Sequence, residues 1–253
     1  MPNDKDLFDH WLEEAERLRF EGWDFSPIAG RYQDEPLTWS YKELAEQALA
    51  KAQVALDMGT GGGEFLSTLE PLSPHLYATE SYAPNLEVAK RRLNPLGIDV
   101  VYATSDAALP FADETFDLVL NRHEYMVAPE IYRILKPEGW FLTQQVGGQD
   151  GRDLNAWLQG DLEHQYYHWS TDLAQHQLQQ AGFTIDTVYE QYVLTRFYDI
   201  GAVVYYLKAV PWQIPDFSVD RYRDRLYVLH RHIQKTGYLQ MQGHRFFIGA
   251  RKV

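Results

Sequence analysis

The most constraining feature of the sequence is a glycine-rich turn that directly follows a short apolar segment. Residues 54–58 (VALDM) predict a buried strand, and residues 59–63 (GTGGG) follow it. Glycines let the backbone adopt positive φ angles and approach a ligand closely. A strand that ends in such a turn is typical of doubly wound α/β folds, in which ligands lie beyond the carboxyl ends of the strands.

Strands and helices alternate along the rest of the chain. Apolar runs predict further strands at 75–79, 99–103, 115–121, 140–146, 183–194 and 244–252. Helical periodicity and capping residues predict helices at 7–18, 40–50, 64–72, 84–93, 129–139, 170–181, 199–208 and 219–236. For the apolar run 201–207 a strand is the alternative. This alternation predicts an α/β fold with a mostly parallel sheet and helices on both faces.

The chain of 253 residues is expected to form a single domain, because α/β folds commonly exceed about 200 residues as one unit. Within it, residues 1–50 predict an N-terminal helical cap with an aromatic flap. Residues 51–197 and 239–253 predict the core of the fold, and residues 198–238 predict a helical lid inserted before the last strand.

Composition narrows the possible functions. Lys and Arg number 23 against 36 Asp and Glu, which gives a net charge of −13, so binding to nucleic-acid phosphates is not expected. The absence of cysteine excludes disulfides, thiolate metal sites and cysteine nucleophiles. The acidic first residues do not match a secretory signal, and no apolar run approaches the ~18 residues of a membrane span. We therefore expect a soluble, cytoplasmic protein without membrane contact.

The glycine-rich turn only partly fits a dinucleotide site. In the pattern GxGxxG, Gly59 and Gly61 match, but Glu64 occupies the position of the third glycine. A carboxylate there, with Asp57 nearby, would repel the oxygens of a pyrophosphate. A nicotinamide-dependent oxidoreductase is therefore disfavoured.

Residues 54–146 resemble the class I S-adenosylmethionine-dependent methyltransferases. The similarity rests on residues 54–63, an acid after the second strand (Glu80), an acid after the third (Asp106), and the segments 109–119 and 133–142. The resemblance implies a doubly wound seven-stranded sheet of order 3-2-1-4-5-7-6 with the last strand antiparallel. It also implies S-adenosylmethionine as cofactor, held by Asp57, Gly59, Thr60, Gly61, Glu80, Ser81, Asp106, Ala107, Asn121 and Arg122.

The chemistry of these residues agrees with that implication. A carboxylate at Glu80 can accept hydrogen bonds from both ribose hydroxyls, and Asp106 can accept one from the adenine amino group. The cofactor carries a positive sulfonium and no phosphate, so a pocket lined by acids suits it.

The end of the fourth strand is the expected place of methyl transfer. His123 is the candidate general base, with Glu124 orienting it, and the alternative is a histidine that only supports the site. Candidate substrate contacts are Arg31, Trp39, Tyr41 and Tyr198. Trp23, Phe25 and Tyr32 belong to the same aromatic flap, which could equally be a core beneath the N-terminal helix. The aromatic segment 197–217 is the candidate specificity element.

The sequence thus predicts a methyltransferase that methylates an O or N atom of a small or medium-sized acceptor. An RNA-modifying methyltransferase and a non-catalytic protein that binds S-adenosylmethionine remain alternatives. No metal site is expected, because the pairs His164/His168 and His230/His232 lack a third ligand at suitable spacing. The sequence does not indicate an oligomeric state.

Overall fold

The computed structural model describes residues 3–20, 24–160 and 166–253. The chain divides into two compact units, and each is described separately. The core unit comprises residues 37–148, 168–191 and 245–253, and the second unit comprises residues 1–36, 149–167 and 192–244. Strands β7 and β8 contribute residues to both units.

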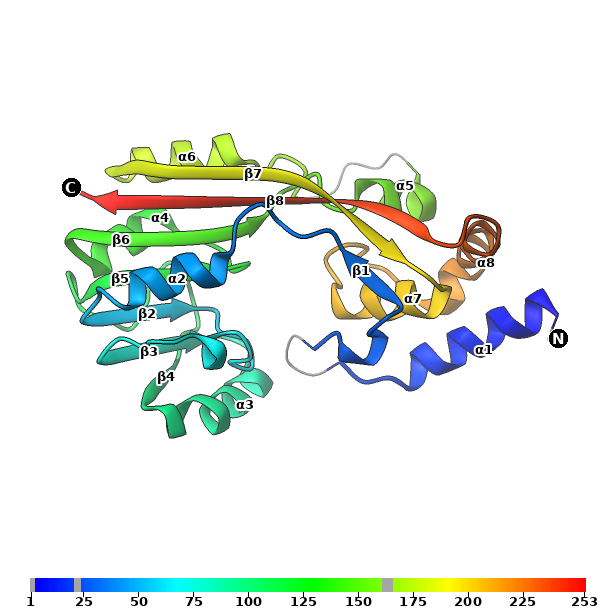
Figure 1. Ribbon diagram of the computed structural model, residues 1–253, viewed down its shortest axis with the longest axis horizontal. Helices are drawn as coiled ribbons and strands as arrows, with labels where there is room; N and C mark the ends of the chain where they lie inside the picture. Colours follow the sequence, from blue (N-terminus) through cyan, green and yellow to red (C-terminus); the bar gives the residue numbers. More distant parts are fainter. Residues whose placement is uncertain (1–2, 21–23, 161–165) are drawn as a thin grey trace. The chain divides into compact units, whose positions relative to one another are not determined.

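The sheet has the order β1-β7-β8-β6-β5-β2-β3-β4 (Figure 1). Its strands are β1 (Tyr32–Asp34), β2 (Val54–Met58), β3 (His75–Glu80), β4 (Ile98–Tyr102), β5 (Phe116–Arg122), β6 (Leu135–Val146), β7 (Phe183–Phe197) and β8 (Leu239–Lys252). Strand β2 pairs with β3 and β5, β3 pairs with β4, and β5 pairs with β6, all in parallel. Strand β8 runs antiparallel to β6. The α/β fold class and the order of the seven expected strands are confirmed.

The number of strands is a correction, because β1 adds an eighth. Tyr32 pairs with Phe197 and Asp34 with Thr195, in an antiparallel ladder at the end of β7. Three residues within a stretch rich in proline, glycine and aromatics show no alternation that would predict a strand. Pairing with β7 therefore creates β1, and local sequence preference does not.

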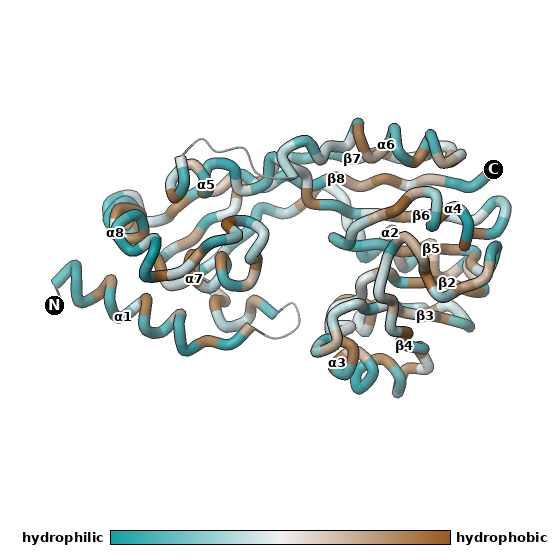
Figure 2. The backbone as a smooth tube through the Cα atoms, turned by 180° about the vertical axis from the view of Figure 1, so that it is seen from behind, coloured by the Kyte–Doolittle hydropathy of each residue, from teal (hydrophilic) through white to brown (hydrophobic). Residues whose placement is uncertain are grey.

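Helices cover both faces of the core unit's sheet, as the sequence predicts (Figure 1). They are α2 (Tyr41–Leu49), α3 (Ala83–Leu93), α4 (Ala128–Ile134) and α6 (Thr171–Gln180). Successive strand residues point to opposite faces, so Leu142 of β6 packs with α2 and α3 while its neighbour Phe141 packs with α4 and α6. Hydrophobic stretches along β5 and β8 mark this core in Figure 2.

Two helix predictions in the core unit are wrong. Residues 64–72 form only a short 3-10 turn at Leu66–Thr68, because Pro71 disfavours helical geometry at the residue before it. Helix α4 ends at Ile134 and β6 begins at Leu135, whereas the sequence predicts a helix through residue 139. Pro137 has the same effect there, since it favours an extended Lys136.

The second unit contains α1 (Asp4–Arg17), the 3-10 turn Ser26–Ile28, β1, α5 (Arg152–Gln159), α7 (Ile200–Ala209) and α8 (Val219–Thr236). Its core centres on α7, of which every residue except Lys208 is buried. Phe8 and Leu12 of α1 and Leu226 of α8 belong to the same hydrophobic cluster. The segment 198–238 is thus helical, as expected, and among the described residues no helix is both long and apolar enough to cross a membrane.

Helix α5 has no counterpart in the sequence prediction. It follows Gly151, which has a φ of 64° and offers no side chain to cap the helix. Because the usual capping residue is missing, the sequence gives no signal for where this helix begins.

Candidate functional site

The glycine-rich turn leaves β2 at the carboxyl edge of the sheet. Gly59 and Gly61 both have a φ of 63°, which favours glycine. The backbone N–H of Thr60 donates to the carbonyl of Thr79 on β3, over 2.9 Å. A Cβ on Gly61 would meet only the Glu64 carboxylate, at 3.9 Å. Between the turn and β3, a stretch that the structure describes throughout, the chain forms only the 3-10 turn Leu66–Thr68, so the helix N-terminus that typically binds a pyrophosphate is missing here.

Glu80 ends β3 directly beside this turn and is buried. Its Oε1 atom accepts the backbone N–H groups of Ser81 at 2.8 Å and Tyr82 at 2.7 Å. Burial raises the pKa of Glu80, while hydrogen bonds from the backbone of Tyr82, Ser81 and Gly61 oppose the shift. The contact with Gly61 brings the end of β3 and the turn after β2 together. Ser81 itself is exposed and contributes its backbone.

Three carboxylates gather where β3, β4 and β5 end. Asp106 lies four residues beyond β4, and burial raises its pKa. Burial, together with the negative charges of Asp106 and Glu80, raises the pKa of Glu124 to about 7. Ala107, the neighbour of Asp106, is exposed, and its N–H donates to Ser105. The cluster concentrates negative charge at one edge of the sheet, which favours hydrogen-bond donors and cations there.

The sequence prediction placed Glu124 beside His123 and did not include it in this cluster. A Cβ on Gly59 would lie 2.2 Å from the Glu124 Oε2 atom, so this carboxylate lies directly against the glycine-rich turn. Its Oε1 atom accepts the backbone N–H of Tyr125 at 3.1 Å. In the described part of the chain Glu124 makes no hydrogen bond to His123, which corrects the expectation that it orients the imidazole.

Asp57 and Arg122 lie beside the turn and influence each other electrostatically. Burial raises the pKa of Asp57 to about 7, and the positive charge of Arg122 opposes the shift. The Arg122 guanidinium lies 4.4 Å from the ring centre of Phe65. Among the described residues its Nε atom has no hydrogen-bond partner although it is buried. Arg122 can therefore still receive an anionic group.

Neighbouring residues of the core unit hold Asn121 in place by hydrogen bonds. It is fully buried, and its Oδ1 atom accepts hydrogen bonds from Thr143 at 2.9 Å and Gln145 at 2.7 Å. Its backbone carbonyl accepts the hydroxyl of Tyr41 at 3.2 Å. If Asn121 contacts a cofactor, its side chain has little hydrogen-bonding capacity left for it.

His123 follows β5 with a φ of 65°. Its backbone N–H donates to the carbonyl of Gln144 on β6 at 2.8 Å, and its Nε2 atom lies 3.3 Å from Gln144 Nε2. Desolvation and the positive charges of Arg122 and Arg245 lower the pKa of His123 well below its usual value, although the residue keeps an exposed face. The two positive charges favour the neutral imidazole.

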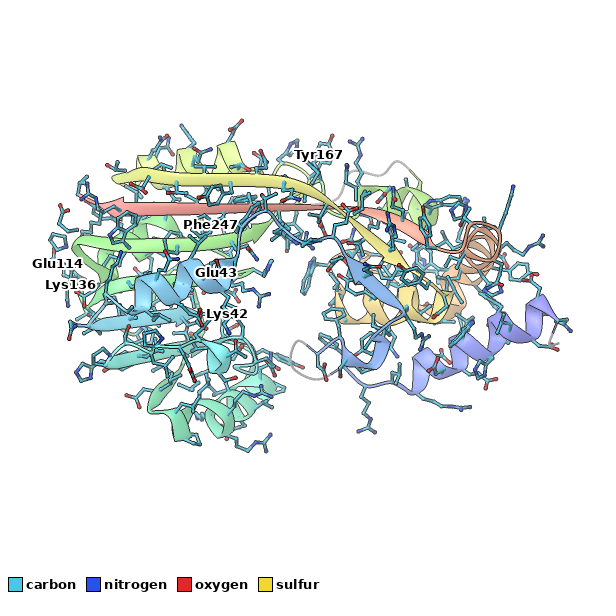
Figure 3. The ribbon with its side chains drawn as sticks, in the orientation of Figure 1. Lys42, Glu43, Glu114, Lys136, Tyr167 and Phe247 are labelled. Carbon is cyan, nitrogen blue, oxygen red and sulfur yellow. The ribbon has the colours of Figure 1, made fainter. Side chains whose placement is uncertain are left out.

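The four candidate substrate residues fall in different units. Trp39 and Tyr41 belong to the core unit, where Tyr41 is buried, lies 6.2 Å from Phe247 of β8 between ring centres, and donates its hydroxyl to two backbone carbonyls. Figure 3 labels Phe247 on this strand. These contacts favour a structural role for Tyr41. Trp39 is half-buried and stacks on Tyr189.

Arg31 and Tyr198 belong to the second unit. Arg31 forms two hydrogen bonds of 2.7 Å with Asp199 and one of 3.0 Å with Glu14. Its charge is therefore already balanced within this unit, which makes it a poor partner for an anionic ligand. The Tyr198 hydroxyl donates to Gln33 at 2.7 Å. Of the flap aromatics, Phe25 and Tyr32 pack against the second unit's hydrophobic core, whereas Trp23 lies outside the described residues.

Replacing Arg31 with alanine is expected to destabilise the second unit without weakening cofactor binding. The change leaves the nearly buried Asp199 carboxylate without its partner, and we expect a loss of about 2–3 kcal/mol in unfolding free energy, reduced from the fully buried case because Arg31 is partly exposed. Urea denaturation measures it. Arg17→Ala, which removes an exposed pair with Glu13, is the control and should change little. Unchanged stability of the Arg31 variant would show that the pair is not structural.

Within residues 3–20, 24–160 and 166–253, no three His, Asp or Glu side chains are arranged to hold a metal ion. His164 lies outside these ranges. His230 is fully buried on α8, with its Nε2 atom 3.3 Å from Asp4.

A strand, a glycine-rich turn and acids at the ends of the next strands define an α/β protein that binds a nucleoside-containing cofactor. Comparison with known proteins agrees. Residues 56–143 match the family model described as a methyltransferase domain. A protein-L-isoaspartate O-methyltransferase of Protochlamydia amoebophila is 30% identical over 165 residues, which cover 60% of this chain and 78% of that protein.

Two further relatives show the range of the match. A malonyl-[acyl-carrier protein] O-methyltransferase of Marinomonas is 31% identical over 141 residues, covering 51% of this chain and 52% of that protein. The crystal structure of a putative methyltransferase from Bacillus halodurans shares the fold, with a TM-score of 0.59, 17% identity, and coverage of 85% and 99%. The chain spans about half the length of the first curated relatives it matches, namely 49%, 46% and 52%.

The chain belongs to the class I S-adenosylmethionine-dependent methyltransferases. Its cofactor is S-adenosylmethionine. The residues fit this molecule, since the carboxylates of the buried Glu80 and the half-buried Asp106 suit hydroxyl and amino donors, and Glu124 adds a negative charge that suits a sulfonium.

Proposed function

We propose that the protein transfers a methyl group from S-adenosylmethionine to an oxygen or nitrogen atom of a small or medium-sized acceptor, with both units acting as one methyltransferase domain. The observation that carries this proposal is the convergence of Glu80, Asp106 and Glu124 on the glycine-rich turn. Relatives named as O-methyltransferases favour attack by oxygen.

Each group at the site has a proposed task. Glu80 accepts the ribose hydroxyls, Asp106 accepts the adenine amino group, and Gly61 leaves open space for the ligand. Arg122 pairs with the carboxylate of the methionine part, because its Nε atom is buried and unpartnered within the described chain. Asp57 counters the charge of Arg122 when no ligand is bound.

Bound S-adenosylmethionine supplies an electrophilic methyl group on a sulfonium. The protein's own contribution is to hold the acceptor atom in line with that group, since orientation accounts for most of the rate in such a displacement. Glu124, when ionised, supplies a negative charge beside the glycine-rich turn, where the sulfonium of a ligand bound there would lie.

A cofactor-consumption assay tests the proposal. The purified protein is incubated with S-adenosylmethionine and fractionated metabolite pools, and S-adenosylhomocysteine is measured by mass spectrometry. We expect production of S-adenosylhomocysteine that depends on one acceptor fraction and is lost in the Glu80→Ala variant. The matched control is Asp99→Ala, which removes an exposed acid from β4 and should keep the production. Binding of S-adenosylmethionine without turnover in any metabolite or RNA pool would favour a non-catalytic role.

A further inference from the structure

The indole of Trp39 fixes the orientation of the Gln144 amide. Trp39 Nε1 lies 3.0 Å from Gln144 Oε1. An indole N–H can only donate, so the amide atom facing it must be the oxygen acceptor. The opposite amide orientation would bring two N–H donors together and lose the bond. Gln144 is buried, and its NH₂ group is therefore directed at the other neighbour, His123.

This orientation determines the proton position on His123. The Gln144 Nε2 donor lies 3.3 Å from His123 Nε2, so that ring nitrogen must carry a lone pair. The ring is then neutral, with its proton on Nδ1. Two guanidinium groups, Arg122 on β5 and Arg245 on β8, act on the ring from the two strands that flank β6 and oppose a second proton. Glu124, the next residue in the chain, lies instead against Gly59.

The backbone holds the ring in this arrangement. His123 has a φ of 65°, a conformation that costs a non-glycine residue about 1 kcal/mol or more. It persists because the His123 N–H donates to the carbonyl of Gln144, the same residue whose side chain contacts the ring. Backbone and side chain of Gln144 thus position one histidine, whose Nδ1 atom makes no hydrogen bond within the described residues.

We propose that His123 is a neutral hydrogen-bond donor through Nδ1–H, not a general base, and that the acceptor it binds is a carboxylate. The proposal rests on the proposed methyltransferase function. With Nε2 occupied by Gln144 and Nδ1 already protonated, the ring has no free lone pair to take a proton. An acceptor that is already ionised needs none to be taken.

A carboxylate fits the site in charge and in chemistry. One carboxylate oxygen accepts the His123 Nδ1–H, and the charge of Arg245 favours an anion beside the ring. The other oxygen donates an electron pair to form the new C–O bond to the methyl carbon, while the C–S bond breaks and its electron pair remains on sulfur. The products are a methyl ester and S-adenosylhomocysteine, and no proton is released.

Nitrogen-15 NMR of the full-length protein tests the proton position directly. His123→Gln identifies the His123 signals among those of the 9 histidines. We expect a protonated Nδ1 and an unprotonated Nε2 between pH 6 and 8. Gln144→Glu replaces the donor with an acceptor, so the proton should move to Nε2 or a second proton should bind. A wild-type ring protonated on Nε2, or one that becomes doubly protonated as pH falls from 7 to 6, would overturn the proposal.

The carboxylate acceptor is tested with methyl-labelled S-adenosylmethionine and a pool of carboxylic acids. Methyl esters release volatile methanol in base, whereas methyl ethers and methylamines do not. We expect base-labile label in the product. Label that resists base would refute the carboxylate acceptor and leave the proposed methyltransferase function standing, whereas the absence of any transfer or cofactor binding would contradict the proposed function itself.

Discussion

Replacing Glu80 with alanine is expected to weaken binding of S-adenosylhomocysteine by about 100-fold. The variant loses two charge-assisted hydrogen bonds to the ribose, each worth about 1.5 kcal/mol, and about 1.4 kcal/mol corresponds to a factor of ten. Asp106→Ala, which loses one such bond, should weaken binding about tenfold. Isothermal titration calorimetry measures both.

Two further variants make this result interpretable. Glu80→Gln keeps an acceptor for the N–H groups of Ser81 and Tyr82 and should show a smaller loss than Glu80→Ala. Asp99→Ala removes an exposed acid from β4 and should bind as the wild type does. A Glu80→Ala protein with wild-type circular dichroism and unaltered affinity would place the cofactor elsewhere.

The second large effect concerns Glu124 and pH. Its pKa in the free protein is raised to about 7 by burial and by the charges of Asp106 and Glu80. A sulfonium favours the ionised form, so bound S-adenosylmethionine should lower this pKa. The affinity for S-adenosylmethionine should therefore rise as pH increases from 6 to 8 and more of the Glu124 carboxylate ionises. S-adenosylhomocysteine, a neutral thioether, should lack this gain.

The ratio of the two affinities isolates the sulfonium charge, because both ligands share the same amino and carboxyl groups. We expect the ratio to rise about tenfold over this range, which corresponds to about 1.4 kcal/mol. Charges about 4–5 Å apart at an effective dielectric of 20 interact by several kcal/mol, so the expected effect uses a modest fraction of that energy. Glu124→Gln should flatten the dependence. A ratio that stays constant in the wild type would mean that Glu124 does not face the sulfonium.

Much of the fold could be predicted because its pattern is local. Alternating apolar runs and helical periodicity predicted the strands β2 to β8 and helices on both faces of the sheet, and the resemblance to the methyltransferases implied the strand order. Segments that depend on distant partners, or that lack a capping residue, could not be predicted. Strand β1 exists only because residues 32–34 pair with β7, and α5 begins without a capping side chain.

The same distinction holds for the candidate site. Glu80 and Asp106 could be proposed from the resemblance to the methyltransferases, and their places at the ends of consecutive parallel strands, which meet at one edge of the sheet, supported the proposal. The position of Glu124 depends on the left-handed backbone conformation at His123, and the residue types in this segment do not predict that conformation. The role of Arg31 depends on Asp199, 168 residues further along the chain. Sequence spacing carries no information on that pairing.

A crystal structure of the complex with S-adenosylhomocysteine tests the central claim most directly. We expect the adenosyl group beside the glycine-rich turn, both ribose hydroxyls within hydrogen-bonding distance of Glu80, and the adenine amino group on Asp106. Clear density for the ligand at another place, or a ribose turned away from Glu80, would contradict the account.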